Sequence, residues 1–451
     1  VAREGLELFN VILPAQPTVT GVLREIAQAQ FLQGKTSTNA LYQLPDMVDD
    51  EKRFVMTLLS HMISSCYGTD QNLLAIVIVR GVKISLRDGM SAPASYIFTF
   101  YAALLGSKLG WYQRAEDYAR LGLKLSERFD NVSLRSRANF AIGSFVNRWR
   151  HHSRESEAYS MKAFEQADSC GDMLYAAYAL YIFSEELCHL GQNLNETCQK
   201  LSLYCNYIEH TAKDQWMLQL MLPMRQYLLA LQGDTHSPTD LGDDQFSEAE
   251  YIGDMNKTGE GRMNEFYPHK GILFYHAGEF PKALEFLRSA IGPMQYHFAM
   301  PIIPVHLFYW TLCLLELRSN NSPLKRVSYT YRIKRNISKM SQWAENSPHN
   351  YTHLKLILMG VSVGERRQWK SALGLLDRGI KSAQDNGYTQ YEALANELAA
   401  RFCLRANRLQ QAQQYMHKAH YLYAFWGAKT KVDYLQRPIQ ELAALLLKHL
   451  Q

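Results

Sequence analysis

The sequence has no long apolar run. Its longest aliphatic run, Leu73–Val79, covers seven residues and ends at Arg80, whereas a helix that spans a bilayer needs about 20. We therefore expect no membrane partner. The apolar pattern resumes beyond Arg80 and is too long for one strand, so we interpret the segment as a buried helix with a weak point at Gly81.

Cysteine is sparse and has no pairing pattern. None of the seven cysteines belongs to a CxxC pair, their number is odd, and no secretory leader precedes them. These features predict reduced, mostly buried thiols in a cytoplasmic protein. The cysteines are Cys66, Cys170, Cys188, Cys198, Cys205, Cys313 and Cys403.

A large excess of one charge is also missing. The 48 Lys and Arg residues exceed the 43 Asp and Glu residues by a formal charge of +5, spread over 451 residues. This balance is too even to indicate nucleic acid as the partner. Apolar residues make up 47% and charged residues 20%, which is ordinary for a globular protein with a large core.

A complete nucleotide-binding motif is absent. Gly34-Lys35-Thr36 matches the end of a phosphate-binding loop, but position 29 holds Ala where the motif needs Gly. The apolar residues before this stretch have the spacing of a helix rather than that of a strand. We therefore interpret Gly34 as the turn that ends a helix, and we expect no cofactor.

Catalytic and metal-binding patterns are not recognisable either. No candidate has the spacing of a zinc site or of a nucleophilic triad. We interpret the histidines as surface or helix-lining residues and acidic pairs such as Glu185-Glu186 as solvated helix faces, so we expect no metal and no enzyme within this chain. The candidates are His151-His152, His269 with His276, Ser347 beside His349, and Glu185-Glu186.

Helical periodicity, in contrast, runs through nearly the whole chain. Amphipathic stretches of about 12 to 20 residues are separated by Gly, Asn, Asp and Pro, with no convincing hairpin signal. The sequence therefore predicts an all-α fold.

Four windows within this pattern share one spacing. A turn residue is followed, two positions later, by four residues at i, i+3, i+7 and i+10, which fall on one face of a helix. The windows are Gly110, Tyr112, Ala115, Ala119 and Gly122; Gly278, Phe280, Ala283, Leu287 and Ala290; Arg367, Trp369, Ala372, Leu376 and Gly379; and Asn407, Leu409, Ala412, Met416 and Ala419.

The spacing has a physical meaning. The first position needs a left-handed turn, and the small residues let the following helix lie close against the preceding one. The preceding helices supply small residues of their own, as at Gly271, Gly360 and Ala400. This unit is the helix-turn-helix of a tetratricopeptide-like repeat, and we predict an α-solenoid of such repeats.

One acidic stretch interrupts the array. From Asp234 to Glu260 the chain has eight acidic residues, one Lys and little helical periodicity, which predicts a long acidic loop or a partly ordered insert. We therefore divide the chain into N-terminal helical repeats at 1–233, the acidic segment at 234–262, and C-terminal tetratricopeptide-like repeats at 263–451.

A basic helix face has the opposite bias. We predict it to bind a protein or peptide partner, or the acidic segment of the same chain, because a basic patch on one helix of a solenoid is typical of protein contacts. Two neighbouring tyrosines leave nucleic acid as an alternative. The cations are Lys325, Arg332, Arg335 and Lys339.

Several tracts resemble a known family closely. The most specific is Ala419–Val432, which contains Trp426-Gly427-Ala428. The other tracts are Leu41–Met47, Leu86–Gly89, Trp343–His353 and Tyr391–Ala400. Together they resemble the tetratricopeptide-like region of very large signalling proteins, in which a kinase-like domain and an AAA/STAND-type ATPase precede the region and a GAF domain and a sensor histidine kinase often follow it.

The resemblance implies a non-catalytic sensor or scaffold whose partner is a protein, a peptide or a flanking domain of the same polypeptide. Any ATPase or kinase chemistry would then lie outside this chain, which begins with Val rather than Met and is expected to be an excerpt. A free-standing adaptor that binds a partner protein is the alternative, and a helical-repeat nucleic-acid binder is a third.

Overall fold

A computed structural model of the chain describes residues 2–258, 262–294 and 299–450. These residues form helices joined by short turns, and they contain no strand, apart from one parallel bridge between Asp46 and Met90. The chain divides into two compact units, 1–183 with 294–300 and 184–293 with 301–451. The all-α prediction is confirmed, whereas the three-part division at 233/234 and 262/263 stays a prediction.

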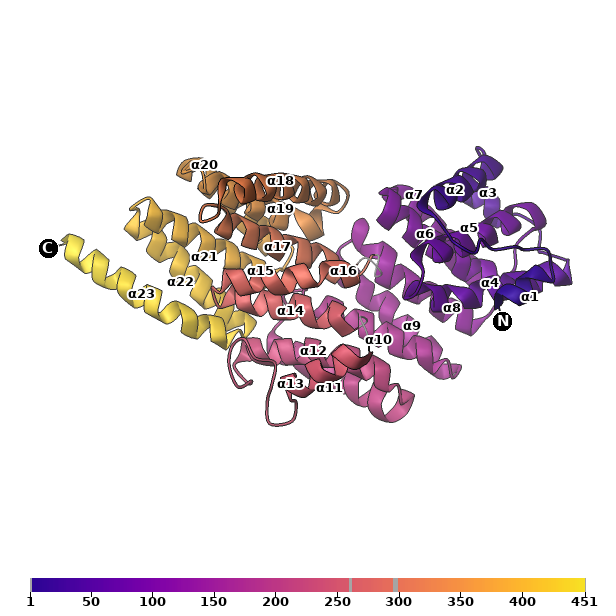
Figure 1. Cartoon of the computed structure of the whole chain (residues 1–451), viewed down its shortest axis with the longest axis horizontal. Coiled ribbons are helices and arrows are strands. Elements are labelled where there is room, and N and C mark those ends of the chain that lie inside the picture. The colour runs from indigo at the N-terminus through magenta and orange to yellow at the C-terminus, as the bar shows by residue number, and fades with distance from the viewer. Residues whose placement is uncertain (1, 259–261, 295–298, 451) are drawn as a thin grey trace. The chain divides into compact units, whose positions relative to one another are not determined.

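The helices follow one another along each unit (Figure 1). In unit 1 they are α1 (Ala2–Glu7), α2 (Val19–Gln33), α3 (Thr38–Tyr42), α4 (Asp50–Tyr67), α5 (Gln71–Asp88), α6 (Ala92–Leu109), α7 (Tyr112–Arg128), α8 (Val132–Ala141) and α9 (Ser156–Ser169). In unit 2 they are α11 (Leu194–Tyr207), α12 (Gln215–Gln232), α13 (Glu248–Thr258), α14 (Met263–His276), α15 (Phe280–Ser289), α17 (Ile302–Arg318), α18 (Pro323–Asn346), α19 (Pro348–Gly364), α20 (Trp369–Asp385), α21 (Thr389–Arg405), α22 (Leu409–Trp426) and α23 (Lys429–Leu450). Helices α10 (Met173–Leu187) and α16 (Ile291–Met294) lie where the two units meet in the sequence.

The apolar run of unit 1 is a helix, as predicted. It lies inside α5, which begins after Asp70, whose carboxylate accepts the backbone N–H groups of Asn72 and Leu73. The expected weak point at Gly81 is wrong, because the helix continues through it. A Cβ atom at Gly81 would lie 2.7 Å from Ile97 of α6, so glycine serves there to bring two helices together.

The turns of the four windows have the left-handed backbone that their spacing requires. The φ angles are 70° at Gly110, 79° at Gly278, 60° at Arg367 and 54° at Asn407. Each turn joins two antiparallel helices of a hairpin, namely α6 and α7, α14 and α15, α19 and α20, and α21 and α22. The helix-turn-helix unit of the α-solenoid is thus present in both units.

Close packing within these hairpins depends on the small residues. A Cβ atom at Gly271 of α14 would meet Leu287 of α15 at 2.6 Å, and one at Gly360 of α19 would meet Leu376 of α20 at 2.9 Å. The two contacts occupy the same place in two repeats. They explain why the first helix of each of these two hairpins carries a glycine opposite a leucine of the second helix.

Unit 2 has two rows of helices. The inner row contains α14, α17, α19 and α21, which contact one another in that order, and the outer row contains α15, α18, α20 and α22. Nearly every residue of α21 from Gln390 to Ala400 is buried. A helix that is covered on all sides must satisfy its polar groups within the protein.

The last helix closes unit 2 onto its beginning. Helix α23 contacts α12, and the hydroxyl of Thr430 donates a hydrogen bond of 2.9 Å to the carbonyl oxygen of Leu231. Two further side-chain amides connect distant segments: that of Asn193 to the carbonyl of Phe425 at 3.0 Å, and that of Gln390 to the carbonyl of His189 at 2.6 Å. The array in this unit therefore returns on itself.

The acidic segment contains more helix than its composition suggests. Residues 234–247 are irregular, but α13 follows, and Ser247 caps it by accepting the N–H of Glu250. Carboxylates in a first turn stabilise a helix, so the acidic bias that predicted a loop also favours this helix start.

None of the described helices combines the length and the apolar composition that crossing a membrane requires.

Replacing Gly360 with Ala should destabilise the chain by about 1–3 kcal/mol, because the new methyl group would overlap Leu376 in a packed contact. The matched change is Gly374→Ala in α20, where no atom lies within 4 Å of the added Cβ. That variant should gain up to about 1 kcal/mol from helix propensity alone. Urea unfolding followed by circular dichroism measures both, and equal effects of the two changes would contradict the packing role of Gly360.

Candidate functional site

A buried ion pair lies in the middle of unit 2. The ammonium of Lys431 on α23 is 2.9 Å from a carboxylate oxygen of Glu397 on α21, and the side chains are 3% and 9% exposed. The hydroxyl of Tyr423 donates a hydrogen bond of 2.8 Å to the same carboxylate. Charges so deeply buried persist only when they are paired and hydrogen-bonded.

The pair extends into a network that joins five helices, α14, α17, α21, α22 and α23. Lys431 also donates to the carbonyl oxygen of His276 on α14, at 3.2 Å. Beside it, Arg401 of α21 pairs with Glu316 of α17 at 3.0 Å. Burial acts to raise the pKa of Glu397, but Lys431, Arg401 and the Tyr423 hydroxyl outweigh it and hold that pKa below its ordinary value. The carboxylate is therefore charged, and the network holds α23 against the inner row.

Three buried histidines of unit 2 are held neutral. Burial lowers the pKa of His269 to about 4 and that of His306 to about 4. Burial, together with the charge of Lys431, lowers the pKa of His276 to about 3. His306 lies 2.6 Å from the carbonyl of Leu287 and His276 lies 3.1 Å from the hydroxyl of Tyr309. These rings are packed and hydrogen-bonded parts of the core.

No metal centre is built from these groups. Over the described part of the chain, no cluster of three or more His, Cys, Asp or Glu side chains could hold an ion. His269, which the sequence places seven residues before His276, stacks on the ring of His189 with centroids 5.7 Å apart. All seven cysteines are free thiols, and five of them are buried.

A small cavity adjoins the buried pair. It has a volume of about 250 Å³ and is lined by residues of α12, α14 and α23 that include Leu231, Leu273, His276, Lys431 and Tyr434. Small-molecule sites usually measure about 300–1,000 Å³. The cavity is therefore smaller than a typical ligand site, and we assign it no ligand.

The predicted basic face lies on the outer row. Lys325, Arg332 and Arg335 are exposed on α18, whereas Lys339 is half-buried with its ammonium 5.3 Å from the ring centroid of Trp343. Arg332 lies over the ring of Trp310 at 5.7 Å. The structure thus brings the four cations onto one helix, and their role as a partner-binding face stays a prediction.

The expected alternative, pairing of this face with the acidic segment of the same chain, is wrong. Within unit 2, α13 and the loop before it lie on the opposite side from α18 (Figure 1). The acidic segment is instead held by Lys270 of α14, whose ammonium is 2.6 Å from Glu248. Lys270 was not predicted, because a cation that pairs across 22 residues has no local signal.

Unit 1 contains a charge cluster that the sequence did not reveal. Glu116 of α7 accepts hydrogen bonds from Arg120 and from His151, the latter at 3.0 Å, and it forms an ion pair with Arg150 at 2.9 Å. Burial acts to raise the pKa of Glu116, but the hydrogen bond from His151 and the two arginines outweigh it and hold that pKa low. His151, interpreted above as a surface or helix-lining residue, is 39% exposed and is also a partner of this carboxylate.

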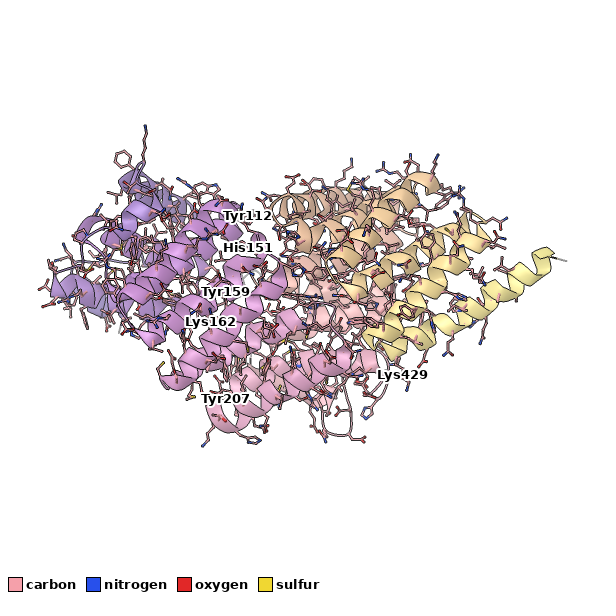
Figure 2. The ribbon with its side chains drawn as sticks, turned by 180° about the vertical axis from the view of Figure 1, so that it is seen from behind. Tyr112, His151, Tyr159, Lys162, Tyr207 and Lys429 are labelled. Atoms are coloured by element: carbon pink, nitrogen blue, oxygen red, sulfur yellow. The ribbon has the colours of Figure 1, made fainter. Side chains whose placement is uncertain are left out.

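The surroundings of this cluster are aromatic. Tyr112 of α7 stacks on Trp149 with ring centroids 5.8 Å apart. Figure 2 shows Tyr112 and His151 next to each other, followed by Tyr159 and Lys162 along α9. The cations around Glu116 are already used by that carboxylate, so the cluster holds α7 against the segment 149–151.

Two further sequence interpretations have clear outcomes. Gly34 follows α2 with φ at 57°, so the turn that ends a helix is confirmed and Gly34-Lys35-Thr36 does not follow a strand.

The expectation that Glu185-Glu186 lie on a solvated face is wrong, because both are at least 96% buried, at 0% and 4% exposure. A pair of carboxylates is read as exposed unless its tertiary partners are known.

Removing one partner of the central pair should be costly. Glu397→Gln keeps the shape of the side chain but leaves the charge of Lys431 buried without its counterion, which costs about 3–5 kcal/mol. The double change with Lys431→Met should restore much of this loss. Urea unfolding measures the loss of unfolding free energy. Glu441→Gln is the control, because the pair of Glu441 with Arg437 is exposed. An equal loss in the single and double variants would contradict the electrostatic role.

Stability should fall as the pH falls from about 6.5 to 4. In this range the unfolded chain binds a proton at each of His269, His276 and His306, whereas the folded chain does not. Each histidine therefore lowers the free energy of unfolding by about 1.4 kcal/mol for every pH unit. His306→Gln should reduce the slope of unfolding free energy against pH. His210→Gln, at a 66% exposed ring, controls for loss of a histidine. An unchanged slope in His306→Gln would contradict the assignment.

Comparisons with known proteins give limited information. No family model matches the chain. A segment of 174 residues, 38% of the chain, is 22% identical to the hybrid signal transduction histidine kinase G of Dictyostelium discoideum, and it spans 5% of that protein. The tetratricopeptide-repeat (TPR) domain of P58(IPK), a solved structure, is 12% identical over 93% of this chain and 98% of that one, with a TM-score of 0.20.

Proposed function

We propose that this chain is a non-catalytic helical-repeat scaffold that regulates flanking catalytic domains of a multidomain signalling protein in the cytoplasm. The flanking domains would include a STAND-type ATPase and a histidine kinase. The observation that carries the proposal is the 174-residue similarity to a signal transduction histidine kinase, in a chain whose described residues form stacked helical hairpins. Because the match spans 5% of that protein, the catalytic chemistry is proposed for other parts of the gene product.

The fold suits such a role. Stacked hairpins present an extended surface on which a partner protein or a neighbouring domain can dock. In unit 2 the inner row is filled by its own side chains and α23 closes the array, so docking is proposed for the outer faces. A partner that binds the active and inhibited assemblies with different affinity would shift the balance between them.

The test compares the full gene product with a variant that lacks residues 1–451. We expect the deletion to raise basal phosphate incorporation from ATP several-fold. Such a change corresponds to the loss of an inhibitory coupling free energy of about 1 kcal/mol or more. The chain alone should incorporate none. Unchanged incorporation after the deletion would contradict the regulatory role, and incorporation by the chain alone would contradict its non-catalytic character.

The sequence of the full gene product distinguishes the second candidate. A product without any ATPase or kinase segment would favour a free-standing adaptor, whose partner would be a separate protein. Tight binding of RNA or DNA that weakens steeply with salt would favour the nucleic-acid alternative instead.

A further inference from the structure

The first turns of α18 are largely exposed, although Tyr329 and Thr330 are half-buried and Arg332 lies over Trp310 of α17. Its buried residues begin at Ile333 and continue with Asn336 and Met340, which face the neighbouring helices. None of the residues from Pro323 to Arg332 is buried. The helix therefore extends about three turns beyond the packed part of the repeat.

Large apolar side chains are exposed on this extension. Leu324 is 85% exposed, Val327 is 71% exposed and Tyr331 is 67% exposed. Their spacing of i, i+3 and i+7 places them in one stripe along the helix. Three large apolar residues in one continuous exposed stripe are typical of a contact surface, whereas single exposed ones need no explanation.

The same helix carries a cationic surplus that nothing nearby neutralises. It contains six basic residues and one acidic residue, Glu345. Among the ion pairs between described residues, none involves these six cations. They are Lys325, Arg326, Arg332, Lys334, Arg335 and Lys339.

Within unit 2, the described acidic segment does not cover this place. The acidic segment before α14 lies on the opposite side of unit 2 (Figure 1) and is held there by Lys270. The exposed residues of α13 include no large apolar side chain, so α13 could not cover an apolar stripe. The stripe and the cations together require a partner that is both apolar and acidic.

We propose that the first half of α18 is a docking surface for an acidic amphipathic helix. This inference rests on the proposed scaffold function and names its surface and partner class. The apolar side of the partner helix packs along Leu324, Val327 and Tyr331, and its carboxylates pair with Lys325 and Arg335, which lie beside that stripe. The cations favour encounter and orientation, and the apolar contact supplies most of the affinity.

Two other classes of partner fit the surface less well. A nucleic acid would use the cations but would leave the apolar stripe exposed. A membrane surface favours a broad apolar face that can be buried along its length, and here the apolar side beyond Ile333 is already packed in the repeat. An acidic helix uses both features within the three largely exposed turns.

The experiment measures binding of the purified chain to a fluorescent peptide by anisotropy. The probe is a helical peptide of about 20 residues with Leu on one face and Glu on the other. We expect the double variant Lys325→Glu/Arg335→Glu to weaken binding about tenfold or more, since two attractive pairs become repulsive. Glu near the start of a helix stabilises it, so Lys325→Glu should not unfold the extension.

The apolar half of the surface has its own variant. Leu324→Gln/Val327→Gln places a good helix former at both positions but removes two of the three apolar side chains of the stripe. It should also weaken binding about tenfold. A matched charge change at exposed cations of other outer helices, Arg288→Glu/Lys370→Glu, should leave the affinity unchanged. Circular dichroism of each variant checks that the helices are intact.

Several outcomes would overturn the proposal. These are no binding of the probe, equal loss in the control variant, or tighter binding of a single-stranded oligonucleotide or of anionic phospholipid vesicles than of the peptide. Self-association in sedimentation that the Lys325→Glu/Arg335→Glu variant abolishes would assign the surface to a second copy. Because this assay uses no ATP, its failure is distinguishable from failure of the regulatory function.

Discussion

The architecture of unit 2 depends on one buried ion pair. Lys431 and Glu397 are separated by 34 residues, and each would be costly in the interior without the other. The pair forms only when α23 lies against α21, and the bond from Lys431 to the carbonyl of His276 requires α14 to lie there too. The burial of two charges thus specifies where the last helix of the array packs. An apolar contact alone would specify this position less strictly.

This closure determines which surfaces are left for function. The inner row of helices, which in an open solenoid would line a groove, is filled in unit 2 by neutral histidines, tyrosines and paired charges. A partner must therefore meet the outer row, where α18 extends beyond the packed repeat with apolar and cationic side chains exposed. A closed unit with an external docking helix is consistent with a scaffold whose partners act from outside.

Local features could be predicted from the sequence, and tertiary ones could not. The all-α fold, the repeat hairpins, the left-handed turn at Gly278 and the helix end at Gly34 follow from spacing and from glycine stereochemistry over a few residues. The burial of Glu185-Glu186, the pair of Lys270 with Glu248 and the cluster around Glu116 depend on partners far along the chain. Their charges resemble those of a solvated face until the fold brings the partners together.

Hydrogen exchange of the backbone amides of unit 2 tests the closure most directly. If the buried pair makes α23 part of the folded unit, amides in its first turns, near Lys431, should exchange as slowly as those of α21 around Glu397. Rapid exchange throughout α23, with α21 still protected, would mean that the last helix is a frayed terminus and that unit 2 is open.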